Sequence, residues 1–173
     1  MIDLESPQWK TAKASPGGNG ALTADLLRQF RDGDDSAFGE LYQQVCHQNT
    51  VGEVAYLAAP QMVAIARNSL PHRRALMLGI VGSIVASMNS YPRSAAPIPD
   101  TLRAEFLASC EDARNLAGES LRQGGLAAND SFQIIGALAA FHGHYPLALL
   151  MNGGPQMSCP SCGEPIEFGE RRG

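Results

Sequence analysis

Hydrophobic residues recur with the period of an α-helix in two successive segments between residues 38 and 66. In the first segment the apolar face consists of Phe38, Leu41, Tyr42, Val45 and Cys46. In the second segment it consists of Val51, Val54, Ala55, Ala58, Met62, Ile65 and Ala66. Neither helix can cover its own apolar face, so the pattern predicts a helical hairpin that packs against neighbouring helices.

Four polar residues, His47, Gln48, Asn49 and Thr50, separate the two segments and are expected to form a structural hinge. Thr50 and Glu53 have the spacing of a capping box, which predicts that the second helix begins at Thr50. His47 and Gln48 could instead act as a functional pair, because an imidazole titrates near neutral pH. We favour the structural interpretation, because helix ends leave carbonyl groups that need donors and no nucleophile or carboxylate lies at catalytic spacing in this segment.

The remaining apolar periodicity predicts helices that begin near residues 23, 71, 100, 129 and 145. The helix after Pro71 is apolar almost all round as far as Met88, which predicts a central position with neighbours on several sides. Its two glycines, Gly79 and Gly82, are expected to permit close helix approach. The inward face of the helix after Asp100 is expected to comprise Leu102, Phe106, Cys110, Ala113, Ala117 and Leu121.

At 173 residues the chain has the length of one domain with small appendages. Residues 1–20 are rich in Ser, Pro and Gly and are expected to form a flexible leader, in which Trp9 can dock on the body. Residues 21–153 are predicted to form a helical-hairpin domain. Residues 154–173 are expected to form a cysteine-bearing tail with a turn or a small β-hairpin. The predicted fold class is therefore all-α.

The charge pattern disfavours several classes of partner. The net charge is -4 and the pI about 5.5, and no helix carries a stripe of Lys or Arg, so nucleic-acid binding is not expected. The longest apolar run, residues 75–88, is too short to cross a bilayer, so no membrane span is expected. The first residues lack the basic flank and apolar core of a secretory signal, which favours a cytoplasmic protein with reduced thiols.

The segment from Leu41 to Ala66 contains a Val-Cys-His-Gln-Asn-Thr-Val core, then Ala-Ala-Pro and Ile-Ala-Arg. It resembles a group of bacterial HEAT-repeat-like proteins whose hairpins carry a His-Gln-Gly-Thr-Val turn and an Ala-rich, proline-broken second helix. The resemblance extends to the buried helix near Pro71, with Asn49 in place of the usual glycine and Gly52 in place of a common aromatic residue. It implies a short right-handed stack of antiparallel helical hairpins. It also implies an adaptor or a toxin-neutralising binder.

Cys159 and Cys162 form a Cys-Pro-Ser-Cys-Gly motif, and a similar tail occurs in some members of that group. Two thiolates at this spacing can hold one tetrahedral Zn²⁺ ion, but they supply only half of its ligands. His142 and His144 could complete the set, or two chains could each contribute one cysteine pair. A knuckle without metal and a redox pair are further alternatives, and we favour a plain structural tail.

No phosphate-binding glycine loop, nucleophile elbow, paired carboxylates or His-Glu-x-x-His helix occurs in the sequence, so we expect a protein without catalytic residues. The resemblance to the HEAT-repeat-like group implies a bacterial immunity or adaptor protein that binds and occludes a protein partner, such as a cognate toxin, and we expect it to do so through a polar groove. The acidic balance of the chain would complement a basic partner. The competing class is a zinc-binding or redox protein centred on Cys159 and Cys162, and a small-molecule enzyme with a helical pocket is a third.

Overall fold

The computed structural model describes residues 2–14, 18–152, 156–158 and 165–167. Within these ranges the chain is mostly helical, which confirms the all-α prediction. The helices are α1 (Gln8–Thr11), α2 (Gly20–Arg31), α3 (Ala37–Val45), α4 (Glu53–Arg67), α5 (Pro71–Ser90), α6 (Asp100–Gln123), α7 (Ala128–Phe141) and α8 (Tyr145–Asn152). The strands are β1 (Cys46–His47), β2 (Thr50–Val51), β3 (Gln156–Ser158) and β4 (Pro165–Glu167), which pair as β1 with β2 and β3 with β4.

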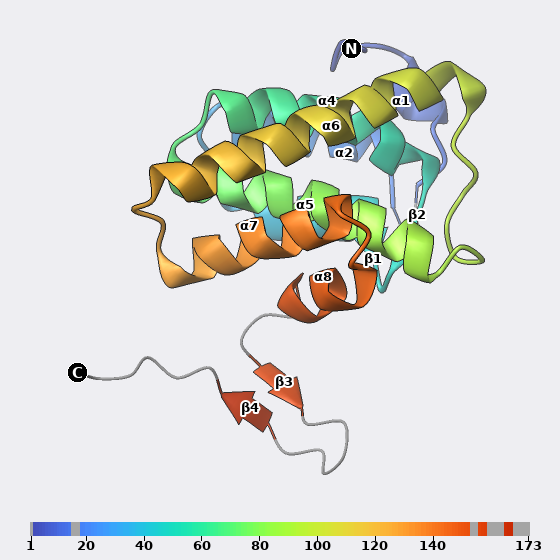
Figure 1. Ribbon diagram of the computed structural model, residues 1–173. Coiled ribbons are helices and arrows are strands. Elements are labelled where there is room, and N and C mark those ends of the chain that lie inside the picture. Colours follow the sequence, from blue (N-terminus) through green and yellow to red (C-terminus); the bar gives the residue numbers. More distant parts are fainter. Residues whose placement is uncertain (1, 15–17, 153–155, 159–164, 168–173) are drawn as a thin grey trace.

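Two pairs of consecutive helices form the body of the molecule (Figure 1). One pair is α4 with α5 and the other is α6 with α7, and each pair is joined by a short connection. In addition, α4 contacts α6 and α5 contacts α7, so the two pairs lie against each other in two layers. α2 and α3 pack beside α4, and α8 covers α5 and α7.

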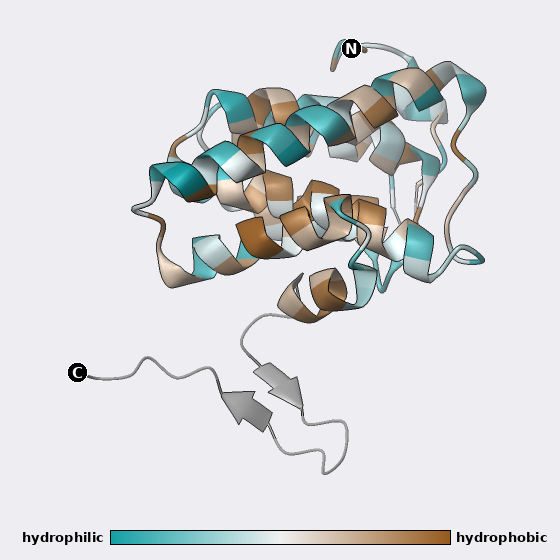
Figure 2. Cartoon of the chain, viewed as in Figure 1, coloured by the Kyte–Doolittle hydropathy of each residue, from teal (hydrophilic) through white to brown (hydrophobic). Residues whose placement is uncertain are grey.

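Helix α5 is the central helix, as its uniformly apolar sequence predicts. Met77, Leu78 and Ile84 are fully buried, and the helix contacts α3, α4, α6, α7 and α8. Gly82 lets α7 approach closely, because a Cβ atom at this position would lie 2.5 Å from Cα of Ala137. Figure 2 shows hydrophobic residues on α5 and α7 and many hydrophilic residues along α6. The core therefore lies around α5, and α6 presents a polar outer side.

The expected flexible leader is largely packed onto the body. Leu4 and Trp9 are buried, with 7% and 1% of their surface exposed, and the indole Nε1 of Trp9 donates to the carbonyl of Asp3 at 3.0 Å. The backbone of Lys13 also accepts a hydrogen bond from the amide of Val54 at 3.0 Å. A buried indole removes a large apolar surface from water. Burial of the Trp9 side chain therefore orders a segment whose Ser, Pro and Gly content predicted a flexible leader.

The predicted hinge is a β-hairpin, and the predicted capping box is wrong. β1 and β2 pair antiparallel, with Cys46 opposite Val51. Between them Gln48 and Asn49 have φ values of 47° and 62°, the left-handed conformation that two-residue hairpin turns favour. Because Thr50 lies in β2, α4 begins only at Glu53.

The last residue of the predicted inward face of α6, Leu121, is more exposed than the sequence predicted. Leu102, Phe106, Ala113 and Ala117 are buried as expected, whereas Leu121 is 37% exposed. Leu121 lies in the last turn of the helix, where α6 extends towards its connection with α7. Among the described residues no helix has both the length and the hydropathy of a membrane span.

Candidate binding surface along α6

Helix α6 is anchored by one buried aromatic side chain. Phe106 is 1% exposed, and its ring meets that of Tyr56 on α4 edge to face, with 5.0 Å between centroids. The Tyr56 hydroxyl in turn donates to the carbonyl of Ala96 at 2.6 Å, which fixes the loop that leads into α6. These contacts bury one face of α6 and leave a hollow on each of its flanks.

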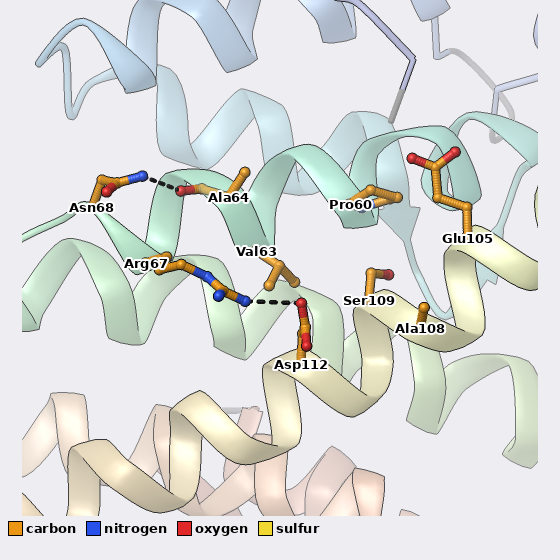
Figure 3. Close-up of a pocket in the computed structure, with 9 residues that line it drawn as sticks. All are labelled: Pro60, Val63, Ala64, Arg67, Asn68, Glu105, Ala108, Ser109 and Asp112. Atoms are coloured by element: carbon orange, nitrogen blue, oxygen red, sulfur yellow. Dashed lines mark hydrogen bonds and ion pairs between the residues drawn. The ribbon is translucent and has the colours of Figure 1, made fainter.

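The first hollow, of about 360 Å³, lies between α4 and α6 (Figure 3). Its lining includes the small side chains of Ala64 on α4 and of Ala108 and Ser109 on α6. Arg67 Nη2 and Asp112 Oδ2 form an ion pair at 2.8 Å that links the two helices. Both side chains are more than half exposed, so the pair adds at most about 1 kcal/mol to stability. This flank is a groove lined by charged and apolar side chains together.

The second hollow, of about 450 Å³, lies between α6, the end of α5 and the end of α7. Its lining is mainly apolar and includes Met88, Leu107, Cys110, Phe141 and Tyr145. Leu107 lines this hollow and is 55% exposed, so an apolar side chain is open to a partner here. The polar residues of this flank are Asn89, Glu111 and Arg114. The second hollow therefore offers an apolar contact surface with a few polar side chains.

The two described cysteines act as packing residues and not as nucleophiles. Burial raises the pKa of the Cys110 thiol to about 12 and also raises the pKa of the Cys46 thiol. A raised pKa lowers the fraction of thiolate, which is the nucleophilic form of cysteine. Cys46 instead lies 3.4 Å from the hydroxyl of Ser87.

The residues of the hairpin turn contact the body in two places. His47 Nδ1 lies 2.6 Å from Gln43 Oε1 one helical turn earlier, so its partner is Gln43. Asn49 Oδ1 accepts a hydrogen bond from the Ser87 hydroxyl at 3.4 Å, which ties the turn to α5. Gln48 is exposed. These contacts hold the turn in place and do not assemble a nucleophile with a base.

The described residues include only two of the four proposed zinc ligands, His142 and His144. His142 and His144 are both exposed at the connection between α7 and α8. Cys159 and Cys162 lie outside the described residues. In the ranges that are described, no group of three or more His, Cys, Asp or Glu side chains could hold a metal ion.

One titratable pair was missed by the sequence analysis. His72 Nδ1 lies 2.6 Å from Asp130 Oδ1, and this contact joins the first turn of α5 to the first turn of α7. The Asp130 side chain is 8% exposed, whereas that of His72 is 60% exposed. The two residues are 58 positions apart, so no local pattern could have paired them.

No protein-family model, curated protein or solved structure matches this chain. The geometry of the described residues therefore carries the functional argument.

Proposed function

We propose that the protein is a non-catalytic protein-binding module with HEAT-like stacked hairpins, whose partner docks along α6. The observation that carries this proposal is the apolar hollow beside α6, with Leu107 more than half exposed at its edge. Methionine and aromatic side chains in such a surface adapt to the shape of a partner. The packing of the α4–α5 pair against the α6–α7 pair supports the hairpin-stack interpretation, because each pair covers the apolar side of the other.

Within this class we propose an immunity or adaptor role, in which the bound partner, such as a cognate toxin, is occluded. Helix α6 carries five carboxylates and three guanidinium groups, in a chain whose net charge is -4. This excess of acidic residues favours a basic partner and would accelerate its association at low salt. A toxin that acts on nucleic acid has such a basic surface, because it must contact phosphates.

Site-specific photo-crosslinking in the native host tests the docking surface. A photoreactive amino acid at Leu107 is expected to capture a defined protein, which is then identified by mass spectrometry. The matched control is the same amino acid at Leu121, which is exposed on the same helix but lines neither hollow. Capture of the same proteins from both positions would contradict the proposal.

The immunity role is tested with the captured partner. If that protein is a toxin, an equimolar amount of the purified chain should abolish its activity, and the Leu107→Lys variant should protect much less. If the partner keeps full activity when it is saturated with the chain, the chain does not occlude its active surface. That result would contradict the immunity role and would favour the adaptor role.

A second candidate function is zinc binding or redox chemistry at Cys159 and Cys162. It is favoured by the pairing of β3 with β4, in which Ser158 lies opposite Pro165. This pairing brings together the two ends of the segment that contains both cysteines. Metal analysis of protein purified without chelator tests the zinc proposal. The proposal requires at least half an equivalent of zinc per chain, and the Cys159→Ser variant should contain none.

A further inference from the structure

A third hollow, of about 290 Å³, lies where the end of α2, the second half of α4 and the start of α5 meet. Its charged lining residues are Arg31 and Arg73, and Gln61, Asn68 and Ser69 add polar groups. No carboxylate belongs to the lining. Each of the two guanidinium groups has a carboxylate partner outside the lining, Asp32 for Arg31 and Asp35 for Arg73.

Arg73 is held in place from two sides. Its guanidinium carbon lies 4.4 Å above the centre of the Phe30 ring, and its Nε forms an ion pair with Asp35 Oδ1 at 2.7 Å. The side chain is only 18% exposed. Its Nη2 is buried and has no hydrogen-bond partner in the described part of the chain. A guanidinium offers five donors, and a buried donor without an acceptor costs stability. Arg73 is thus a fixed cation with unused donor capacity.

The ends of three helices surround the hollow. Two of the last carbonyls of α4 accept side-chain hydrogen bonds, because Asn68 Nδ2 donates to Ala64 at 3.0 Å and Ser69 Oγ donates to Ile65 at 2.8 Å. The dipoles of α2 and α4 are negative at the hollow, whereas Arg73 lies in the first turn of α5, whose dipole is positive at that end.

We propose that this hollow binds a small-molecule oxyanion, a carboxylate or a phosphate group, held by Arg73 and Arg31. An oxyanion accepts hydrogen bonds from a guanidinium, and the Nη2 donor of Arg73 has no partner in the described residues. Arg31 is 52% exposed and pairs with Asp32 at 2.9 Å, so it can turn towards a ligand. The site is separate from the second hollow beside α6, because Arg73 and Val85 lie about 18 Å apart along α5, and it shares Ala64 and Asn68 with the first hollow.

Titration of the full chain at constant ionic strength tests the proposal, with arginine side-chain NMR signals as the readout. Inorganic phosphate, acetate and chloride are compared. We expect saturable shifts of the Arg31 and Arg73 signals with phosphate or acetate, and the anion that saturates at the lower concentration identifies the ligand class. Shifts that never saturate, or that chloride reproduces, would overturn the site.

Variants separate this site from general charge effects. Arg31→Gln is expected to weaken binding about tenfold, which corresponds to the loss of one hydrogen bond to a charged group. The control is Arg103→Gln, because Arg103 is 54% exposed, is paired with Asp100 and lies far along the sequence on α6. Arg73→Lys keeps the charge but removes the fork, and it should weaken binding further if the variant folds. Equal affinities for the wild type, Arg31→Gln and Arg103→Gln would contradict the proposal.

Discussion

At the scale of single residues, close helix packing and burial explain most of the unusual positions. Only glycine fits at position 82, because Ala137 of α7 lies against its backbone. Trp9 is the buried side chain that packs the N-terminal segment onto the body. Asn49 and Gln48 adopt left-handed backbone conformations, which asparagine tolerates better than glutamine. At each of these positions the geometry predicts whether a substitution raises or lowers the stability of the protein.

Gly82→Ala should lower the free energy of unfolding by about 1–3 kcal/mol, because the new methyl group meets backbone atoms of α7 that cannot move aside. Gly39→Ala is the matched control, because a Cβ atom at Gly39 in α3 would meet nothing within 4 Å. The control should raise stability by about 0.5–1 kcal/mol, since alanine is the better helix former. Urea unfolding measures both values, and a neutral or stabilising Gly82→Ala would show that the helices are less closely packed.

Trp9→Ala should destabilise the protein by about 3–5 kcal/mol, because the indole is almost fully buried. Thr11→Ala, on the same short helix and exposed, serves as the control and should change stability by less than about 0.5 kcal/mol. Thermal unfolding monitored by circular dichroism gives the comparison. Equal stabilities of the two variants would mean that the N-terminal segment does not pack on the body in solution.

The raised pKa of Cys110 makes a prediction for alkaline pH. The unfolded thiol ionises near pH 9, whereas the buried thiol keeps its proton up to about pH 12. Unfolding therefore becomes easier as the pH rises between these values, and the contribution of this group is fully present below pH 9. The Cys110→Ala variant should lose less stability than the wild type over this interval. Equal slopes of stability against pH for both proteins would contradict the burial of the thiol.

At the scale of elements, the helices could be predicted from the sequence, and the short hairpin could not. Apolar periodicity located α4, α6 and α7 because each helix has a continuous buried face, whereas α5 was located by its uniformly apolar sequence. Strands β1 and β2 have only two residues each, which is too short to show the alternating pattern of a strand. The spacing of Thr50 and Glu53 also matches a capping box, so the sequence pointed to a helix start instead. Leu121 was misplaced because periodicity does not reveal where a neighbouring helix ends.

Gln48 provides a test of the hairpin that does not disturb any packing, because its side chain is exposed. Gln48→Gly should raise stability by up to about 1 kcal/mol, since glycine adopts positive φ without steric cost. Gln48→Val should lower stability by about 1–2 kcal/mol, because a β-branched residue is strained in this conformation. The midpoint of thermal unfolding reports both changes, and the opposite order would exclude the left-handed turn.

At the scale of the whole molecule, α6 combines a buried anchor, an acidic outer side and a hollow on each flank. The sequence predicted the anchor and the charges, since both lie within one helix. It could not predict the hollows, because their lining residues, such as Ala64 and Ser109, come from different helices. The oxyanion pocket was missed for the same reason, since Arg31 and Arg73 lie on separate helices.

The affinity of the captured partner for two single variants tests the binding role of α6 most directly. Leu107→Ala should weaken binding about tenfold or more, as expected for an exposed apolar side chain that becomes buried in an interface. Leu121→Ala, on the same helix but away from both hollows, should change the affinity less than about twofold. Two variants that bind as tightly as the wild type would contradict the proposal that the partner lies along α6.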